Sequence, residues 1–154
     1  MKTQRGFTVV ELLIVMSITL ILLGLATINL VHSQQTASLT SMEEIVIADL
    51  SQQQLKSMIG DTEGRLTQDS YGIHFDSNRY VLFHGTYSAG DTSNFVVNLD
   101  SNMQFNNPGF DVIFSRLSGE ITAPTAIELQ DNTNSKLERI HLNTLGTVTQ
   151  VESL

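Results

Sequence analysis

The sequence has no cysteine and few basic residues, and each shortage excludes a class of function. Without cysteine there is no disulfide framework, no thiolate metal site and no cysteine nucleophile. Eight Lys and Arg stand against 16 Asp and Glu, for a formal net charge of −8. Lys2 and Arg5 precede Phe7, and removing their two charges from −8 leaves −10 on residues 7–154. Nucleic acid binding depends on clustered cations, so this charge argues against it.

Charge is also nearly absent from a long hydrophobic stretch close to the N-terminus. From Phe7 to Val31 the one charged residue is Glu11, and about 20 apolar residues suffice for a helix to cross a bilayer. We therefore predict a transmembrane helix over residues 7–31. Two cations precede it, and the next is Lys56. The positive-inside rule then predicts a cytoplasmic N-terminus and an exported remainder.

A cleavable secretory signal peptide is the alternative interpretation of this stretch. Such a signal has a basic start, an apolar run of about 7 to 15 residues and a cleavage site of small residues. The run here is longer, and the following "GLATINLVHSQQ" offers only "GLA" as a cleavage candidate. The length of the run favours a helix that stays in the product.

The start of the apolar run resembles a known processing signal. The segment "RGFTVVELLIVMSITLILLGLA" is similar to the class III signal and N-terminal helix of type IV pilins and pseudopilins. The resemblance implies that a prepilin peptidase cleaves between Gly6 and Phe7 and methylates the new α-amine of Phe7. A residue without a side chain suits close approach of a protease to the backbone. Many major pilins have a proline late in this helix, where this chain has Ile28 and no proline before Pro108.

Glu11 needs an explanation, because a carboxylate at the centre of a membrane helix costs roughly 2.5 to 3.5 kcal/mol. It lies about one helical turn inside the cytoplasmic boundary, where its side chain can reach the membrane surface. The resemblance implies a partner in the filament, the α-amine of Phe7 on a neighbouring subunit. Contact between the two charges would largely offset their desolvation and would select one register. An interfacial acid that the membrane tolerates is the alternative.

The chain beyond the polar "HSQQTAS" continues with a helical period. Apolar residues recur at spacings of three to five with acids and glutamines between them, which indicates an amphipathic helix. The apolar set is Leu39, Met42, Ile45, Val46, Leu50, Leu55, Met58 and Ile59. Gly60 is expected to end the helix. The sequence therefore predicts one helix of about 50 residues, apolar all round at first and amphipathic over residues 32–60.

Short β-type segments separated by turn residues follow from about residue 61. "YGIHF" and "RYVLFHG" flank "DSN", which predicts a hairpin with Asp76 and Asn78 in its turn. Further strands are expected in "FVVNL", "FDVIFSR", "TAIELQ" and "LERIHLN". Their partial alternation of apolar and polar residues is typical of antiparallel strands with one buried face. The predicted class is α+β, with the long N-terminal helix packed on an antiparallel β-sheet as in the pilin fold.

The C-terminal part carries a finer resemblance. "FDVIFSRLSGEI", "TAIELQ" and "LERIHLNTLGTVTQ" are similar to the end of the H-type (GspH/FimT-like) minor pseudopilins of type II secretion and the related minor pilins. In that pattern an apolar strand reaches a glycine turn, and a last hairpin ends near a Gly-x-Val. Many relatives have Arg after the last glycine, where this chain has Thr147.

No further residues form a catalytic or metal-binding pattern. The sequence contains neither a G-x-S-x-G motif nor the H-E-x-x-H spacing of zinc enzymes. The histidines are His32, His74, His84 and His141. "DNTNSKLE" lacks the Gly of an EF-hand loop and a final Glu at the required spacing. Calcium at an unlocated acidic loop stays a hypothesis, because some major pseudopilins bind it. We predict no enzyme activity, no metal and no cofactor.

The predicted protein is a minor pilin or pseudopilin subunit of a type IV pilus or type II secretion pseudopilus. Its segments are a cytoplasmic leader (1–6), a transmembrane or filament-core helix (7–31), an amphipathic continuation (32–60) and an exported β-rich domain (61–154). Its expected partners are prepilin peptidase, other pilins through the N-terminal helix, the inner-membrane assembly platform, and membrane lipid before assembly. The expected locations are the cytoplasmic (inner) membrane and then a periplasmic or cell-surface filament.

Three alternatives stay open. The chain could be a major pilin of a surface fibre, a FimT-like DNA-uptake pilin, or a single-pass membrane-anchored binding domain without a filament. DNA uptake requires a basic patch, whereas the cations of the exported part are scattered among acids. These cations are Arg65, Arg79, Arg116, Lys136 and Arg139.

Overall fold

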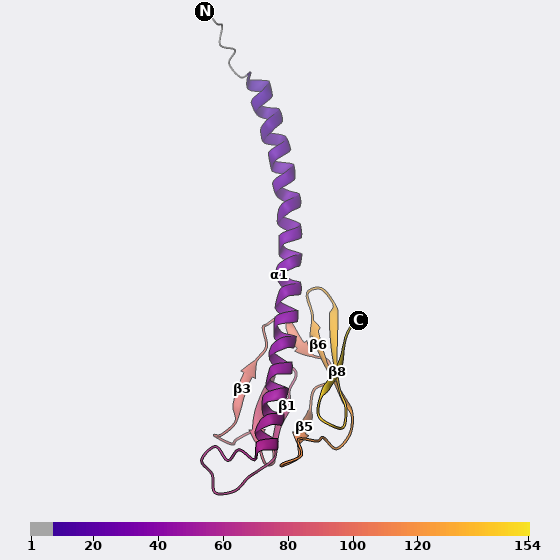
Figure 1. Ribbon diagram of the computed structural model, residues 1–154. Coiled ribbons are helices and arrows are strands. Elements are labelled where there is room, and N and C mark those ends of the chain that lie inside the picture. Colours follow the sequence, from indigo (N-terminus) through magenta and orange to yellow (C-terminus); the bar gives the residue numbers. More distant parts are fainter. Residues whose placement is uncertain (1–7) are drawn as a thin grey trace, which may run out of the picture. The chain divides into compact units, whose positions relative to one another are not determined.

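A computed structural model describes residues 8–154, with the side chains of residues 8–24 and 38–154. Contacts divide the chain into two compact units, which meet between Ser38 and Leu39 and are described separately here. Helix α1 (Val9–Ile59) contributes to both, and eight strands follow it in the described part of the chain (Figure 1). The predicted α+β class, with a helix packed on antiparallel β-structure, is confirmed.

The strands form two antiparallel sheets of four. The first sheet has the order β3-β2-β1-β5 and the second the order β4-β6-β7-β8. The bounds are β1 (Tyr71–Phe75), β2 (Arg79–His84), β3 (Phe95–Asn98), β4 (Met103–Phe105), β5 (Phe110–Phe114), β6 (Thr125–Asp131), β7 (Lys136–Leu142) and β8 (Val148–Ser153). Ile73 at the middle of β1 lies opposite Leu82 of β2 and Val112 of β5. The helix therefore packs against two sheets, where the sequence indicated one.

The predicted hairpin is confirmed, and two strands are additions to the prediction. Asp76 and Asn78 lie between β1 and β2, and the Asp76 amide donates to the Arg79 carbonyl at 2.9 Å. Strands β4 and β8 lie outside the segments expected from the sequence. Strand β4 alternates between apolar and polar residues but has only three of them, too few to indicate a strand, and β8 is mostly exposed and lacks a buried apolar face.

The end of α1 at Gly60 is also confirmed. Gly60 has φ of 65°, in the left-handed region that glycine adopts without steric cost. Its amide donates to the Ser57 carbonyl at 3.2 Å, and the Asp61 amide donates to the Lys56 carbonyl at 2.9 Å. This pair of bonds is the Schellman motif, which satisfies carbonyls that the last helical turn leaves free.

The C-terminal half of α1 packs through a face that matches the predicted one only in part. Leu39, Val46 and Leu50 are almost completely buried. Four other members of the predicted apolar face are 47% to 63% exposed, namely Ile45, Leu55, Met58 and Ile59. Polar residues, Gln53 and Ser57, take the buried positions of the last two turns. They follow Leu50 at steps of three and four, so they lie on its side of the helix.

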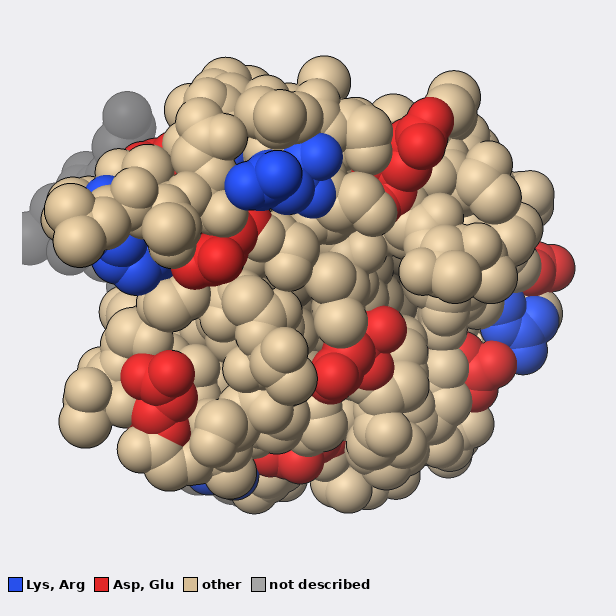
Figure 2. Space-filling model, turned by 90° about the horizontal axis from the view of Figure 1, so that it is seen from below, with Lys and Arg blue, Asp and Glu red and all other residues tan. Residues whose placement is uncertain are grey.

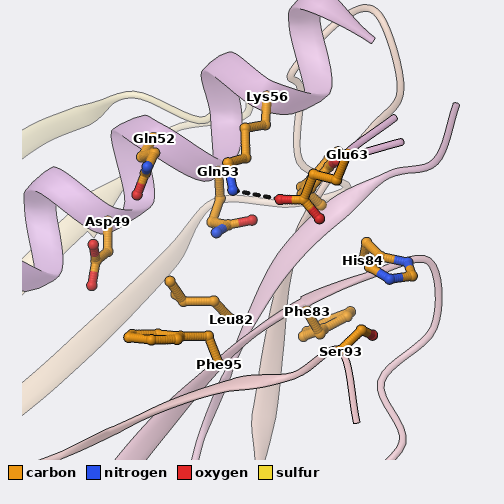
Figure 3. Close-up of a pocket in the computed structure, with 11 residues that line it drawn as sticks. Asp49, Gln52, Gln53, Lys56, Glu63, Leu82, Phe83, His84, Ser93 and Phe95 are labelled. Carbon is orange, nitrogen blue, oxygen red and sulfur yellow. Dashed lines mark hydrogen bonds and ion pairs between the residues drawn. The ribbon is translucent and has the colours of Figure 1, made fainter. Parts of the chain in front are cut away.

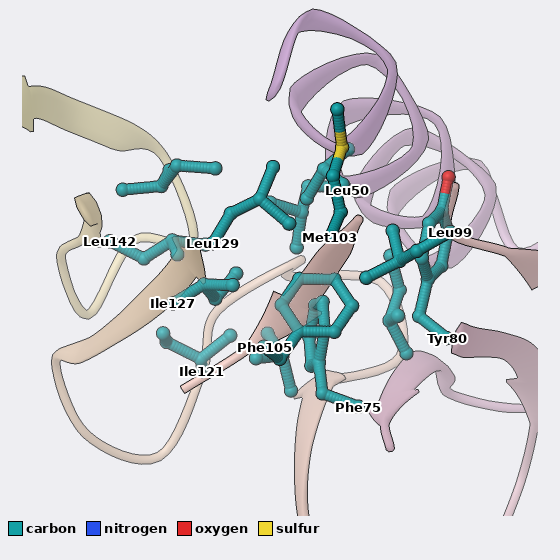
Figure 4. Packing of buried hydrophobic residues seen from close by; sticks show 14 of the residues in the cluster. Leu50, Phe75, Tyr80, Leu99, Met103, Phe105, Ile121, Ile127, Leu129 and Leu142 are labelled. Carbon is teal, nitrogen blue, oxygen red and sulfur yellow. The ribbon is translucent and has the colours of Figure 1, made fainter. Parts of the chain in front are cut away.

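The core lies between this half of α1 and the inner faces of both sheets. Buried side chains from the two sheets meet there, with the Phe75 and Phe105 rings in an edge-to-face contact at 5.0 Å between centroids. Figure 4 shows Leu50 of the helix beside Met103 and Leu129. Tyr80 is also fully buried, and its hydroxyl donates to the Asp49 carboxylate at 2.6 Å. One continuous core thus joins the helix to both sheets.

Ser57→Ala is expected to lower the free energy of unfolding by about 1 to 3 kcal/mol. The Ser57 hydroxyl is buried and lies 2.7 Å from the Phe114 carbonyl and 2.9 Å from the Ser115 carbonyl, to which it donates. The substitution leaves these carbonyls without that donor. Ser51→Ala is the control, because the exposed Ser51 hydroxyl bonds only to Ile47 of its own helix. Urea unfolding should separate the variants, and equal midpoints would contradict the expectation.

Candidate functional site

The N-terminus of α1 brings Thr8 and Glu11 together. Thr8 directly precedes the helix, and Glu11 is its third residue. Glu11 Oε2 accepts from the Thr8 amide at 2.9 Å and from the Thr8 hydroxyl at 2.8 Å. In return, the Glu11 amide donates to the Thr8 hydroxyl oxygen at 3.2 Å. This reciprocal arrangement is a capping box, in which two side chains satisfy free amides of the first helical turn.

The capping box changes the account of Glu11 given by the sequence. The sequence resemblance gave the acid a partner on another subunit, the Phe7 amine, and left Thr8 without a role. The signal was present, since a Thr followed three residues later by Glu before an apolar run is a known helix start. Within the single chain, therefore, the carboxylate accepts two hydrogen bonds and lies at the positive end of the helix.

The other predicted processing residues lie outside the described residues. These are Lys2, Arg5, Gly6 and Phe7. Cleavage after Gly6, methylation of Phe7 and contact between Phe7 and Glu11 of neighbouring subunits therefore stay predictions. Glu11 is the one member of this predicted set within the described part of the chain.

Helix α1 presents apolar side chains on every side between Val9 and Leu23. Its large apolar residues in this range are 53% to 75% exposed. The hydroxyls of Ser17 and Thr19 donate to carbonyls four residues earlier, at 2.8 and 2.7 Å. These bonds satisfy the hydroxyl donors within the helix. The surface of this stretch therefore presents few polar groups that still need a hydrogen-bond partner.

No helix within the described residues is both long and apolar enough to qualify as a membrane span. The predicted span over residues 7–31 also includes Phe7 and the side chains of residues 25–31, which are outside the description. The predicted membrane helix accordingly stays a prediction.

Histidines of the β-rich part lie beside carboxylates without forming a metal cluster. The His74 ring stacks on Tyr87 with centroids 3.9 Å apart, and its two nitrogens lie 2.5 Å from Asp111 and 3.2 Å from Asp76. His84 and His141 each lie within 3.8 Å of one carboxylate. No group of three or more potential metal ligands occurs among the residues that the structure describes, and the His32 side chain is not one of them.

The "DNTNSKLE" segment forms a turn around a buried acid. Asp131 is 1% exposed, and its carboxylate accepts from the Thr133 amide at 2.8 Å and the Asn134 side-chain amide at 3.1 Å. The carboxylate is thus used by the turn itself. Calcium binding at another acidic loop stays a hypothesis from the sequence.

Basic residues of the unit formed by residues 39–154 are mostly paired with acids. Arg79 bonds to Asp76 at 2.8 Å, and this bond is the main reason that the pKa of Asp76 lies below its ordinary value. Arg139 lies 2.9 Å from Glu128, and Lys56 lies 2.6 Å from Glu63. On the face shown in Figure 2, Lys and Arg side chains lie apart, with Asp and Glu side chains among them. This distribution does not form the basic patch that DNA binding requires.

Comparison with known proteins identifies the N-terminal segment. Residues 1–27 match the family described as the prokaryotic N-terminal methylation motif. No curated protein and no solved structure matches the chain. The motif belongs to structural subunits rather than enzymes, and it implies a membrane-anchored subunit that prepilin peptidase processes and that assembles with other pilins. The match therefore supports a type IV pilin-like protein.

Proposed function

We propose that this chain is a minor pilin or pseudopilin subunit of the H type, built into a type IV pilus or a type II secretion pseudopilus. Prepilin peptidase would cleave between Gly6 and Phe7 and methylate the Phe7 amine. The observation that carries the proposal is the N-terminal methylation motif over residues 1–27, joined to a helix that begins at Val9 and leads into an α+β domain.

The exposed apolar residues of α1 support two successive environments for the helix. Side chains such as Val9, Leu13 and Leu20 are 58% to 75% exposed in the single chain. A helix that is apolar all round requires lipid or other apolar helices around it. Bilayer lipid would surround it before assembly and neighbouring pilin helices afterwards, with residues 7–31 anchored in the cytoplasmic (inner) membrane and the C-terminal domain outside.

Glu11 would then have a different partner in each state. Before assembly the carboxylate accepts hydrogen bonds from Thr8 at the start of its own helix. In the filament it would meet the methylated amine of Phe7 on a neighbouring subunit. A buried carboxylate without a counter-charge costs several kcal/mol, so this contact would select the register in which subunits pack.

The C-terminal hairpin supports the assignment to the H type. Strands β7 and β8 pair, and the turn between them contains Gly146 two residues before Val148. This is the Gly-x-Val ending that the sequence resemblance implies. A low copy number in isolated filaments would support a minor subunit, whereas an abundant, self-assembling subunit would indicate a major pilin.

Mass spectrometry of the mature N-terminus tests the proposal. The expected N-terminal residue is N-methyl-Phe7, because cleavage after Gly6 exposes the Phe7 amine for methylation. Gly6→Leu is the matched variant and should retain residues 1–6, since its side chain obstructs the peptidase at the scissile bond. A mature chain that starts at Met1, or after "GLA", would remove the pilin proposal.

A further inference from the structure

A pocket of about 360 Å³ lies between α1 and the open side of the first sheet. The helix contributes polar side chains, among them Asp49, Gln52 and Gln53. The sheet contributes apolar ones, among them Leu82 and Phe95 (Figure 3). All of these residues belong to the unit formed by residues 39–154. The helix side of the pocket is therefore polar, and the strand side combines apolar side chains with His84 and Ser93.

The helix side of the pocket contains an acceptor without a donor. Gln53 is 2% exposed, and its Oε1 has no hydrogen-bond partner among the described atoms. In Figure 3 the Gln53 side chain extends from the helix toward the strands. A buried carbonyl oxygen without a donor destabilises the folded chain. A ligand that supplies a donor would remove this penalty, and the other groups of the pocket select the chemistry of such a ligand.

A carboxylate and an aromatic ring lie near this acceptor. Asp49 accepts from the Tyr80 hydroxyl through Oδ2, and no other donor to this carboxylate occurs among the described residues. Figure 3 shows the Phe95 ring across the pocket from Asp49. Phe95 is 65% exposed, although an aromatic ring usually gains from burial. A carboxylate facing an aromatic ring suits a cation, which is attracted by both.

The cation already in the pocket is neutralised. Lys56 Nζ lies 2.6 Å from Glu63 Oε1 and 5.6 Å from the centre of the Tyr71 ring. Because the charges of Lys56 and Glu63 cancel, the Asp49 carboxylate gives the pocket lining a net formal charge of −1. An anionic ligand would meet the Asp49 carboxylate, so the charge favours a cationic one.

We propose that this pocket binds the guanidinium group of an arginine side chain from a partner protein. The flat guanidinium has five N–H donors and stacks on aromatic rings. It can therefore donate to the Asp49 carboxylate while one face lies on the Phe95 ring, and Gln53 Oε1, which is buried in the empty pocket, accepts from it once the Gln53 side chain turns toward the ligand. The charge of −10 on residues 7–154 would steer basic segments toward this part of the chain. Binding at this pocket does not require filament assembly, because the lining residues all lie within the unit formed by residues 39–154.

Titration with N-acetyl-arginine amide tests the proposal on the full-length protein in detergent micelles, with calorimetry or NMR as the readout. N-acetyl-citrulline amide is the matched ligand, because it keeps the shape of arginine and lacks its charge. We expect saturable binding of the arginine amide, and binding of the citrulline amide at least about tenfold weaker. Absence of saturable binding, or equal binding of the two amides, would overturn the proposal.

Two variants locate the ligand. Asp49→Asn retains an acceptor for Tyr80 but removes the charge, and Gln53→Leu removes the buried acceptor. Each should weaken binding of the arginine amide by about tenfold or more. Gln53→Leu should also keep or raise the melting temperature, because it removes a buried polar atom without a partner. This second readout separates loss of binding from loss of folding.

Glu44→Gln is the control for general charge. Glu44 is exposed on the same helix and outside the pocket lining. Its replacement removes one negative charge and should leave the affinity unchanged. Equal weakening by Glu44→Gln and Asp49→Asn would overturn the proposal in favour of diffuse electrostatic attraction, as would unchanged affinity in both pocket variants.

Discussion

Glu11→Ala is expected to reduce incorporation of the subunit into filaments by at least about tenfold, while insertion into the membrane and cleavage after Gly6 continue. Removing one partner of a buried ion pair costs about 3 to 5 kcal/mol, and each 1.4 kcal/mol is a factor of ten. In the proposed filament the Phe7 amine would be the charge left without a partner. The measurement is the ratio of subunit in sheared filaments to subunit in membranes, by immunoblotting.

The capping box makes it possible to separate the effect of the Glu11 charge on assembly from the effect of the helix cap. Glu11→Gln keeps a side chain that can accept from Thr8 at the helix start but removes the charge. Thr8→Ala removes the cap, at about 0.5 to 2 kcal/mol of helix stability, but keeps the charge. We expect the Gln variant to fail in assembly like the Ala variant, and Thr8→Ala to assemble more nearly normally. Normal incorporation of Glu11→Gln would show that the charge pair is not needed.

The features that the sequence predicted well depend on local chemistry. Gly60 ends α1 because its left-handed conformation closes a Schellman motif. Asp76 and Asn78 form the expected turn between two strands with apolar residues on their buried face. In each case the residues that determine the structure lie within a few positions of one another, so a single sequence contains the signal.

The features that the sequence did not predict depend on distant contacts. Gln53 was assigned with the other glutamines to the wet side of the helix because it is polar, yet its side chain is buried. Ser57 is buried as well, and its hydroxyl bonds to carbonyls 57 and 58 residues away. The division into two sheets depends on pairing between separated strands, such as β1 with β5. The pocket beside Gln53 has the same origin, since it joins residues of α1 to Phe95 of β3.

Gly146→Ala is expected to lower the free energy of unfolding by roughly 2 to 5 kcal/mol, from left-handed backbone strain of about 1 to 2 kcal/mol and overpacking of about 1 to 3 kcal/mol. Gly146 has φ of 76°. A Cβ there would lie 2.5 Å from the Gly119 carbonyl oxygen and 2.7 Å from Gln54 Nε2. That nitrogen donates to the Gly119 and Leu145 carbonyls at 3.0 and 2.6 Å. The added methyl would therefore push the loops that contain Gly119 and Gly146 away from Gln54 of α1.

Gly85→Ala is the control for this prediction, because it isolates the backbone strain. Gly85 has φ of 69°, and a Cβ there would meet no atom within 4 Å. Only the left-handed backbone strain should therefore lower the free energy of unfolding of Gly85→Ala, by about 1 to 2 kcal/mol. Urea unfolding followed by tyrosine fluorescence reports on the exported part, since its three tyrosines are the only ones in the chain. Equal midpoints at equal m-values for the two variants would mean that glycine is required at position 146 only for its backbone conformation, and that the close approach to Gly119 does not limit stability.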